Sequence, residues 1–234
     1  MLSRLFGRRN DPGENPRTDE NVDYLVEDEF SSLNDFEKPS ASLPLIGRNS
    51  LMKRKQHGTS AVPIQPNLKW KVNRRLANPI CNHNRHFAEN HGYFHQSTPF
   101  LRHEDPQKNN SNNQQPLIFY DSNTGLPLFR IPRSSLAWQS FVHESKRHGW
   151  PSFRDHHVNW KHVRCLANGE CISRHGTHLG HNIPDAQGKN RYCINLVSIA
   201  GYPTNTNNNT CTSNNNSSSS PKEGMQGEYD RQDT

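Results

Sequence analysis

The sequence Arg191-Tyr192-Cys193-Ile194-Asn195 opens a β-prone run that continues to Ile199. Side chains alternate between the two faces of a strand, so Cys193 and Asn195 share one face while Tyr192, Ile194 and Leu196 share the other. The pattern predicts a strand from Arg191 to Ile199 that packs apolar side chains against a core. The same strand would present the Cys193 thiol to a cleft.

The residue types around Cys193 suit a reactive thiolate. Arg191 lies two positions away on the same strand face, where its positive charge could lower the thiol pKa. Upstream, His178-Leu179-Gly180-His181 places two imidazoles on a Gly-containing turn that could fold back and donate protons. A cysteine on a strand is most often an inert buried residue. Its combination with Arg191 and the two imidazoles favours a catalytic interpretation instead.

Local signals predict two hairpins upstream of this stretch. Residues 117–120 and 126–131 are β-prone and flank a turn at Asp121-Ser122-Asn123. A second hairpin is predicted at Asn168-Gly169, a dipeptide typical of two-residue turns. This turn would place Leu166 opposite Cys171 and Cys165 opposite Ile172. Cys165 and Cys171 would then face opposite sides of the sheet, so no disulfide between them is expected.

One helix is predicted between these hairpins. Ser134-Ser135 offers an N-cap, and Gly149 and Pro151 end the helix after His148. Its apolar face would be formed by Leu136, Phe141 and Val142.

Four motifs, in this order, resemble those of the B-type methionine-R-sulfoxide reductases, the SelR family. They are Thr124-Gly125-Leu126-Pro127-Leu128-Phe129, His148-Gly149-Trp150-Pro151-Ser152-Phe153, Gly176-Thr177-His178-Leu179-Gly180-His181 and Arg191-Tyr192-Cys193-Ile194-Asn195. The resemblance runs from about Leu117 to Gly201. It implies a mainly β fold of two small antiparallel sheets with one flanking helix. It also implies peptide-methionine (R)-S-oxide reductase activity through a cysteine sulfenic acid.

The resemblance also implies the roles of individual residues. The catalytic set is Cys193 as nucleophile, His178 and His181 as proton donors, Arg191 beside the thiol, Asp185 orienting an imidazole, and Asn195 holding the sulfoxide or a water molecule. Trp150 and Phe153 are expected to bind the substrate. Spacing alone would assign Trp150 to the core, but the matching Trp of the family contacts the methyl group of the sulfoxide.

The chain departs from the family pattern at the metal positions. Many family members hold a structural zinc on two Cys-x-x-Cys pairs, whereas this chain has Asp121, Thr124, Ile172 and His175 there. A tetrahedral thiolate site cannot be built from this set, so neither zinc nor another cofactor is expected.

The chain also lacks the usual resolving cysteine, where it has His148. The sulfenic acid on Cys193 would have to condense with another thiol. Cys165, Cys171 and Cys211 are the candidates, and an external thiol reductant such as thioredoxin could also reduce Cys193 directly.

Composition predicts one small domain with long tails. Of the 234 residues only 30% are hydrophobic, and the mean hydropathy is −1.04. Residues 11–37 carry ten acidic residues and one arginine, and residues 38–75 carry nine basic residues and no acidic one. These blocks and the Asn-rich linker predict a disordered charged arm over residues 1–115. The catalytic domain would span 116–202, followed by a disordered Asn/Ser-rich tail over 203–234.

Composition also bounds the partners and the compartment. No apolar run is long enough to span a membrane, and five cysteines without regular spacing favour a reducing compartment, by default the cytoplasm. The Arg-rich start and Lys53-Arg54-Lys55 leave mitochondrial and nuclear locations as alternatives. Expected partners are oxidised protein substrates and a thioredoxin-like reductant, not membranes or nucleic acid.

Two further interpretations remain open at the level of sequence. The first is a metal site between Cys81 and His103, where the chain has one cysteine and five histidines. Their spacing matches no known zinc module, and the alternative is that these histidines are simply solvated. The whole protein could instead be an inactive SelR-like binding module that uses its basic arm to hold an acidic partner.

Overall fold

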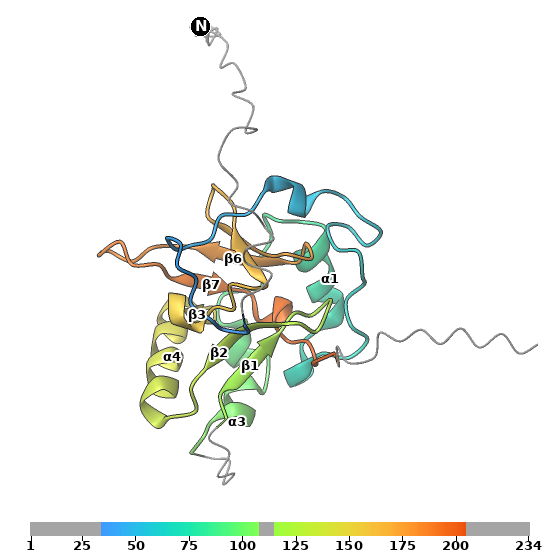
Figure 1. The fold of residues 1–234 in the computed structure, drawn as a ribbon. Helices are drawn as coiled ribbons and strands as arrows, with labels where there is room; N and C mark the ends of the chain where they lie inside the picture. Colours follow the sequence, from blue (N-terminus) through green and yellow to red (C-terminus); the bar gives the residue numbers. More distant parts are fainter. Residues whose placement is uncertain (1–33, 108–114, 205–234) are drawn as a thin grey trace, which may run out of the picture. The chain divides into compact units, whose positions relative to one another are not determined.

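Residues 34–107 and 115–204 are described by the structure, a computed structural model. Their strands form a two-stranded sheet and a five-stranded sheet in the order β3-β7-β6-β5-β4 (Figure 1). The strands are β1 (Leu117–Tyr120), β2 (Pro127–Ile131), β3 (Ser152–Phe153), β4 (Val163–Cys165), β5 (Glu170–Ser173), β6 (His178–Asn182) and β7 (Tyr192–Ile194). Every pairing between them is antiparallel. The prediction of a mainly β fold with two antiparallel sheets is confirmed.

The first hairpin and the predicted helix form where local signals placed them. Helix α4 spans Ser135–His148, and the Ser134 side chain caps it by accepting a hydrogen bond from the Ala137 amide (3.3 Å). Gly149 ends the helix in the left-handed conformation, with φ 85°. The predicted apolar face of α4 was partly wrong. Leu136 is 77% exposed, and the buried face is formed by Trp138, Phe141 and Ser145.

The last strand is shorter than predicted. β7 ends at Ile194, and the chain then turns into the 3-10 helix η5 (Leu196–Ser198). The reason is a buried carboxylate from a distant segment: Glu89 accepts hydrogen bonds from the amides of Leu196 (2.8 Å) and Val197 (2.9 Å). These amides would otherwise be available to a neighbouring strand.

The motif His178-Leu179-Gly180-His181 is a strand and not the predicted turn. It begins β6, which lies between β5 and β7 and pairs with both. Gly180 permits this central position, because a Cβ there would lie 2.1 Å from the Cys193 carbonyl oxygen. The motif therefore lies in the middle of the five-stranded sheet beside the Cys193 strand.

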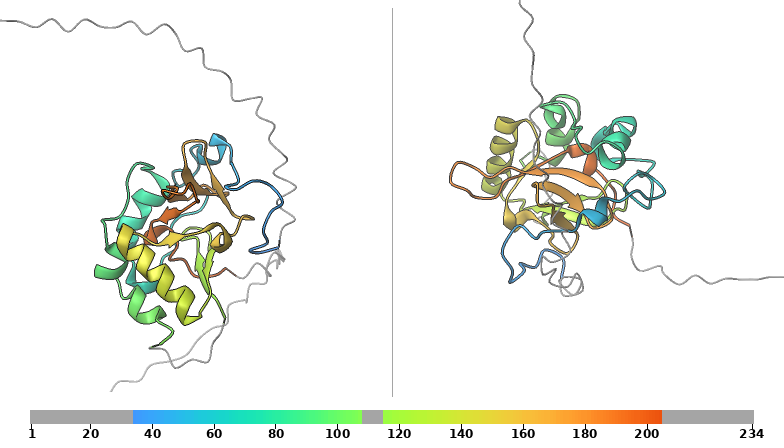
Figure 2. Two further views of the ribbon diagram at one scale, coloured as in Figure 1. Left: turned by 90° about the vertical axis from the view of Figure 1, so that its left-hand side faces the viewer. Right: turned by 90° about the horizontal axis from the view of Figure 1, so that it is seen from above.

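The expected disordered arm over 1–115 is wrong for residues 34–107. This segment contains η2 (Asn49–Met52), η3 (Lys69–Lys71), α1 (Arg74–Asn82), α2 (Tyr93–Gln96) and α3 (Phe100–Glu104). The described residues up to Thr204 belong to one compact unit. In Figure 2, α1 to α3 and α4 lie on one side of the strands, and the segment after residue 34 (blue) runs along the other. Residues 1–33, the linker 108–114 and the tail 205–234 lie outside the described residues.

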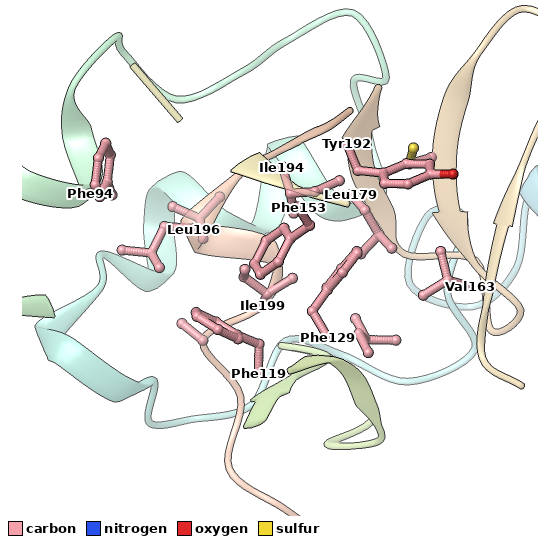
Figure 3. Packing of buried hydrophobic residues seen from close by; sticks show 14 of the residues in the cluster. Phe94, Phe119, Phe129, Phe153, Val163, Leu179, Tyr192, Ile194, Leu196 and Ile199 are labelled. Atoms are coloured by element: carbon pink, nitrogen blue, oxygen red, sulfur yellow. The ribbon is translucent and has the colours of Figure 1, made fainter. Parts of the chain in front are cut away.

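The N-terminal segment contributes directly to the hydrophobic core. Ile64, Ile80, Phe94 and Phe100 are at most 1% exposed and belong to the same cluster as the strand residues. Around Phe119, aromatic rings pack closely, and Figure 3 shows several of them between the two sheets. None of the helices in the described part of the chain combines the length and apolar composition that crossing a membrane requires.

This core predicts that the N-terminal segment contributes to global stability. Ile80→Ala should lower the free energy of unfolding by about 2–5 kcal/mol, because it leaves a cavity under α1. The exposed Arg75 on the same helix is the control, and Arg75→Ala should change stability by less than about 0.5 kcal/mol. Urea denaturation measures both, and equal small effects would mean that the segment does not fold with the sheets.

Candidate functional site

A cavity of about 230 Å³ opens beside Cys193. It is lined by residues in and directly after β6 and β7, by Trp150 two residues after α4, and by a stretch of the N-terminal segment: His178, Gly180, His181, Ile183, Cys193, Asn195, Trp150, Arg85, His86, Phe87 and Ala88. The structure thus brings together Cys193, both predicted histidines, Asn195 and Trp150.

A strand irregularity directs both histidines into this cavity. Residues three positions apart face opposite sides of a regular strand. In β6 the register shifts, since Cys171 pairs with Gly180 while Ile172 pairs with His178, so Leu179 is an extra residue. Leu179 lies in the core, and His178 and His181 both line the cavity.

The Cys193 thiol lies partly exposed in this cavity, directly across from His181 in the sheet. Burial raises the thiol pKa above its ordinary value, and the charge and hydrogen bond of Arg191 offset only part of this effect. Arg191 does act on the thiol, as predicted, but the net shift is upward. The Arg191 guanidinium is itself buried, and its Nη1 has no hydrogen-bond partner among the described residues.

His178 is held by an ion-pair network. Its Nδ1 lies 2.9 Å from Glu170 Oε1, and both side chains are at most 3% exposed. Arg85 binds the same carboxylate through Nε (2.8 Å to Oε1) and through Nη2. Burial opposes ionisation of Glu170, but hydrogen bonds from His178 and Arg85 outweigh it and lower its pKa to about 2. An ionised Glu170 only accepts hydrogen bonds, so Nδ1 of His178 carries a proton and Nε2 is left for the cavity.

His181 is a neutral imidazole near pH 7. Desolvation of the ring, followed by the nearby His178, lowers its pKa below the ordinary value. The two rings lie 5.8 Å apart between centroids. His181 is therefore suited to accept a proton from the thiol before it donates one.

Glu89 connects the walls of the cavity. Besides capping η5, its carbonyl oxygen accepts a hydrogen bond from Trp150 Nε1 (3.0 Å), and its amide donates to Asn195 Oδ1 (3.2 Å). Asn195 Nδ2 in turn donates to the Leu179 carbonyl (3.2 Å). Two predicted site residues are thus positioned by one residue of the N-terminal segment.

Asp185 does not have the predicted role. Its carboxylate binds Arg154 Nη1 (2.8 Å) and accepts hydrogen bonds from the amides of Gln187 and Lys189, so it shapes the loop between β6 and β7. The hydrogen bond from Arg154 lowers the pKa of Asp185. The carboxylate that orients an imidazole is that of Glu170, which contacts His178, and not that of Asp185.

Phe153 is also misassigned by the sequence interpretation. Its position in β3 pairs with Tyr192, and its ring is fully buried and stacked on Phe129 at 4.4 Å. Because Tyr192 faces the core, Phe153 does too. It is a core residue and does not line the cavity.

Cys165 and Cys171, predicted as candidate resolving cysteines, lie on the opposite face of the sheet from Cys193. Cys165 pairs directly with Cys171, and Cys171 with Gly180, which is opposite Ile194. Both thiols therefore share the core face of the sheet with Ile194, while Cys193 faces the cavity. The expected register, with the two thiols on opposite faces, was wrong. Cys211 lies outside the described residues.

Of the four positions where the family holds zinc, Asp121 belongs to a hydrogen-bonded cluster, and the Thr124 amide donates to its Oδ1 (3.4 Å). Thr177 Oγ1 lies 2.9 Å from Asp121 Oδ1, and the Asn123 amide donates to the same oxygen (2.8 Å). Asn123 Nδ2 continues to Asn82 Oδ1 at the end of α1 (3.1 Å). The four zinc positions themselves, Asp121, Thr124, Ile172 and His175, supply no thiolate and do not fit a structural zinc site. Over residues 34–107 and 115–204, no three His, Cys, Asp or Glu side chains are grouped so that they could hold a metal ion.

The residues between Cys81 and His103 have separate environments. Cys81 is fully buried, with its thiol 3.4 Å from Ser198 Oγ. His91 packs edge-on against Trp150, and His95 against Phe94. His86 lines the cavity.

Sequence interpretation missed Arg85, Glu89 and Glu170. Glu170 directly follows the predicted Asn168-Gly169 turn and begins β5. A charged residue at the start of a predicted strand was the only sequence feature that could have indicated its role. Arg85 and Glu89 lie in a segment assigned to the disordered arm. The only local signal there was Asn73, whose side chain caps α1 by accepting hydrogen bonds from the amides of Arg75 and Leu76.

No protein-family model matches this chain, and no curated protein matches it either.

The buried Glu89 predicts a pH-dependent stability. Burial raises its pKa to about 8, although the amides of Val197 and Leu196 favour the carboxylate. The folded state therefore holds a proton that the unfolded state has released, and the free energy of unfolding falls as pH rises toward 8. Between pH 6.5 and 8 the decline should be about 1–2 kcal/mol.

Glu89→Gln cannot ionise and should remove this decline, even though it lowers stability because its NH2 group cannot accept one of the two amide hydrogen bonds. Glu37→Gln makes the same change at an exposed position and should keep the wild-type slope. Urea denaturation at several pH values measures the slope. A Gln variant with the wild-type slope would show that another group carries the proton.

Proposed function

We propose that the protein is a peptide-methionine (R)-S-oxide reductase with Cys193 as its nucleophile. The observation that carries the proposal is one cavity that contains a partly exposed thiol, a neutral imidazole opposite it in the sheet and a fixed Trp150. The motif resemblance supports the reaction class and the preference for the R sulfoxide.

The first step requires no outside proton. His181 accepts the Cys193 proton, and the thiolate attacks the sulfoxide sulfur. The imidazolium returns the proton to the oxygen, and the S–O bond of the substrate breaks as that oxygen becomes the sulfenic acid on Cys193. The thiol and the sulfoxide become a sulfenic acid and a thioether, so Cys193 is oxidised and the substrate reduced. Arg191 stabilises the negative charge while it lies on sulfur or oxygen.

Apolar side chains at the mouth of the cavity support a protein substrate. Phe87 and Ile183 line the cavity and remain 48% and 47% exposed. Together with Trp150 they offer apolar contacts to the methylene and methyl groups of a methionine side chain. An external thiol, such as a thioredoxin-like protein, completes the cycle by reducing the sulfenic acid.

The proposal predicts that Cys193→Ser abolishes turnover. The serine hydroxyl is protonated at neutral pH and is a poor nucleophile toward sulfur. The assay measures reduction of methionine-R-sulfoxide and methionine-S-sulfoxide separately, with dithiothreitol as reductant. Cys211→Ser is the control and should keep the single-turnover rate.

Two outcomes would reject this assignment. Activity above a few per cent in folded Cys193→Ser would move the chemistry to another thiol. Lack of turnover by the folded wild-type protein with either sulfoxide would favour the binding-module alternative.

His181 should control both the rate and the pH profile of the first step. His181→Ala should lower the single-turnover rate by about 10²–10⁴-fold, the usual contribution of acid–base catalysis. His143→Ala, at an exposed position on α4, is the control and should have no effect. Single-turnover rates isolate this step because no reductant takes part in it.

The sign of the pH dependence follows from the two shifts. The pKa of His181 is below 6.5 and that of Cys193 above 9.0, so the neutral pair predominates between these values. Below the window the imidazolium cannot accept the thiol proton, and above it the pair has no proton for the oxygen. The rate should therefore fall at both ends. A profile in His181→Ala that keeps the acid limb would assign that limb to another group.

A further inference from the structure

Cys165 and Cys171 form a close pair of thiols in the core. Their sulfur atoms lie 3.4 Å apart, and both residues are fully buried. They occupy directly opposite positions in β4 and β5. Both are free cysteines in the structure.

The turn explains this register. The Leu166 amide donates to the Glu170 carbonyl (2.8 Å), and the Gly169 amide to the Leu166 carbonyl (2.9 Å). Gly169 has φ 85°, so Ala167, Asn168 and Gly169 form a three-residue turn that ends in a left-handed residue. One more turn residue than predicted moves Cys171 opposite Cys165.

The two cysteines form a non-hydrogen-bonded pair. The Cys165 amide donates to the Leu45 carbonyl, and its carbonyl accepts from the Gly47 amide, each at 2.8 Å. Both polar groups of Cys165 therefore point away from β5. Opposite residues at such positions have Cα atoms about 4.5 Å apart, within the range of about 4.4–6.8 Å that a disulfide spans. Rotation of the side chains is sufficient to join the sulfur atoms.

We propose that Cys165 and Cys171 are a redox-active dithiol that hydrogen peroxide closes to a cross-strand disulfide. One thiol attacks peroxide, the O–O bond breaks, and a sulfenic acid and one water form. The second thiol attacks that sulfenic sulfur, and a second water leaves as the S–S bond forms. The two sulfurs lose two electrons and the peroxide gains them. A small oxidant is required because both thiols are buried. Burial also raises the pKa of the Cys171 thiol, so closure is slow and is expected over hours.

This dithiol acts independently of Cys193 and of the proposed reductase activity. The sheet separates the two, since Cys193 faces the cavity and the pair faces the core. Closure affects the hairpin that carries Glu170, the residue before Cys171. A disulfide across this hairpin reduces the number of conformations open to the unfolded chain, and it should raise Tm by about 5 °C.

The experiment treats the full chain and its Cys193→Ser variant with hydrogen peroxide for hours, then blocks free thiols and maps cross-linked peptides by mass spectrometry. The expected result is a Cys165–Cys171 cross-link in both proteins at equal yield, with a higher Tm that dithiothreitol reverses. Cys81 is equally buried and contacts Ser198, so it should remain a free thiol in the same digests.

Three outcomes would overturn the proposal. These are blocked free thiols at both positions after oxidation, cross-links of either cysteine to another residue, or a cross-link that requires Cys193. The last would show that oxidation is relayed from the cavity. Cys171→Ala provides a second readout, because it should remove the peroxide-dependent rise in Tm even if it lowers the starting Tm.

Discussion

The hydrogen bonds of Glu89 determine how the cavity is assembled. Its carboxyl group ends β7 by accepting hydrogen bonds from the amides of Leu196 and Val197, and its main chain fixes Trp150 and Asn195. A buried acid is costly unless its oxygens are satisfied, and two backbone amides provide this compensation. The interaction joins residues 107 positions apart in the sequence, so the N-terminal segment and the last strand have to fold together. The cavity is complete only when both are in place.

The two faces of the five-stranded sheet place their thiols in different environments. Cys193 shares its face with His181 and with a cavity open to solvent, whereas Cys165 and Cys171 share the other face with the core. The face of the sheet on which a thiol lies therefore decides which groups surround it. Alternation of side chains across the strands keeps a solvent-accessible thiol apart from a buried pair, although all three belong to the same sheet.

Local signals predicted the first hairpin and α4, but not the structure of the segment before residue 108. Ser134 and Gly149 define the ends of α4 through contacts a few residues away, so the sequence displays them. Ile80 and Phe94 are buried through contacts with distant elements, and they lie among polar residues that indicate disorder. The hairpin register depended on whether the Asn168-Gly169 turn has two or three residues, and a difference of one residue moves every side chain to the other face.

The same distinction applies to the candidate site. Cys193, His178 and His181 were found through motifs, but their electrostatics depend on burial, which a motif does not show. Arg191 next to the thiol suggested a thiolate, yet burial outweighs its charge and raises the thiol pKa, while desolvation lowers that of His181. Both shifts favour the neutral forms. In the proposed reaction, the charged pair forms only while a bound sulfoxide is present to receive the proton. A thiol that is protonated at rest reacts with peroxide more slowly than a thiolate does. The site would therefore combine low resting reactivity with activation by its own substrate.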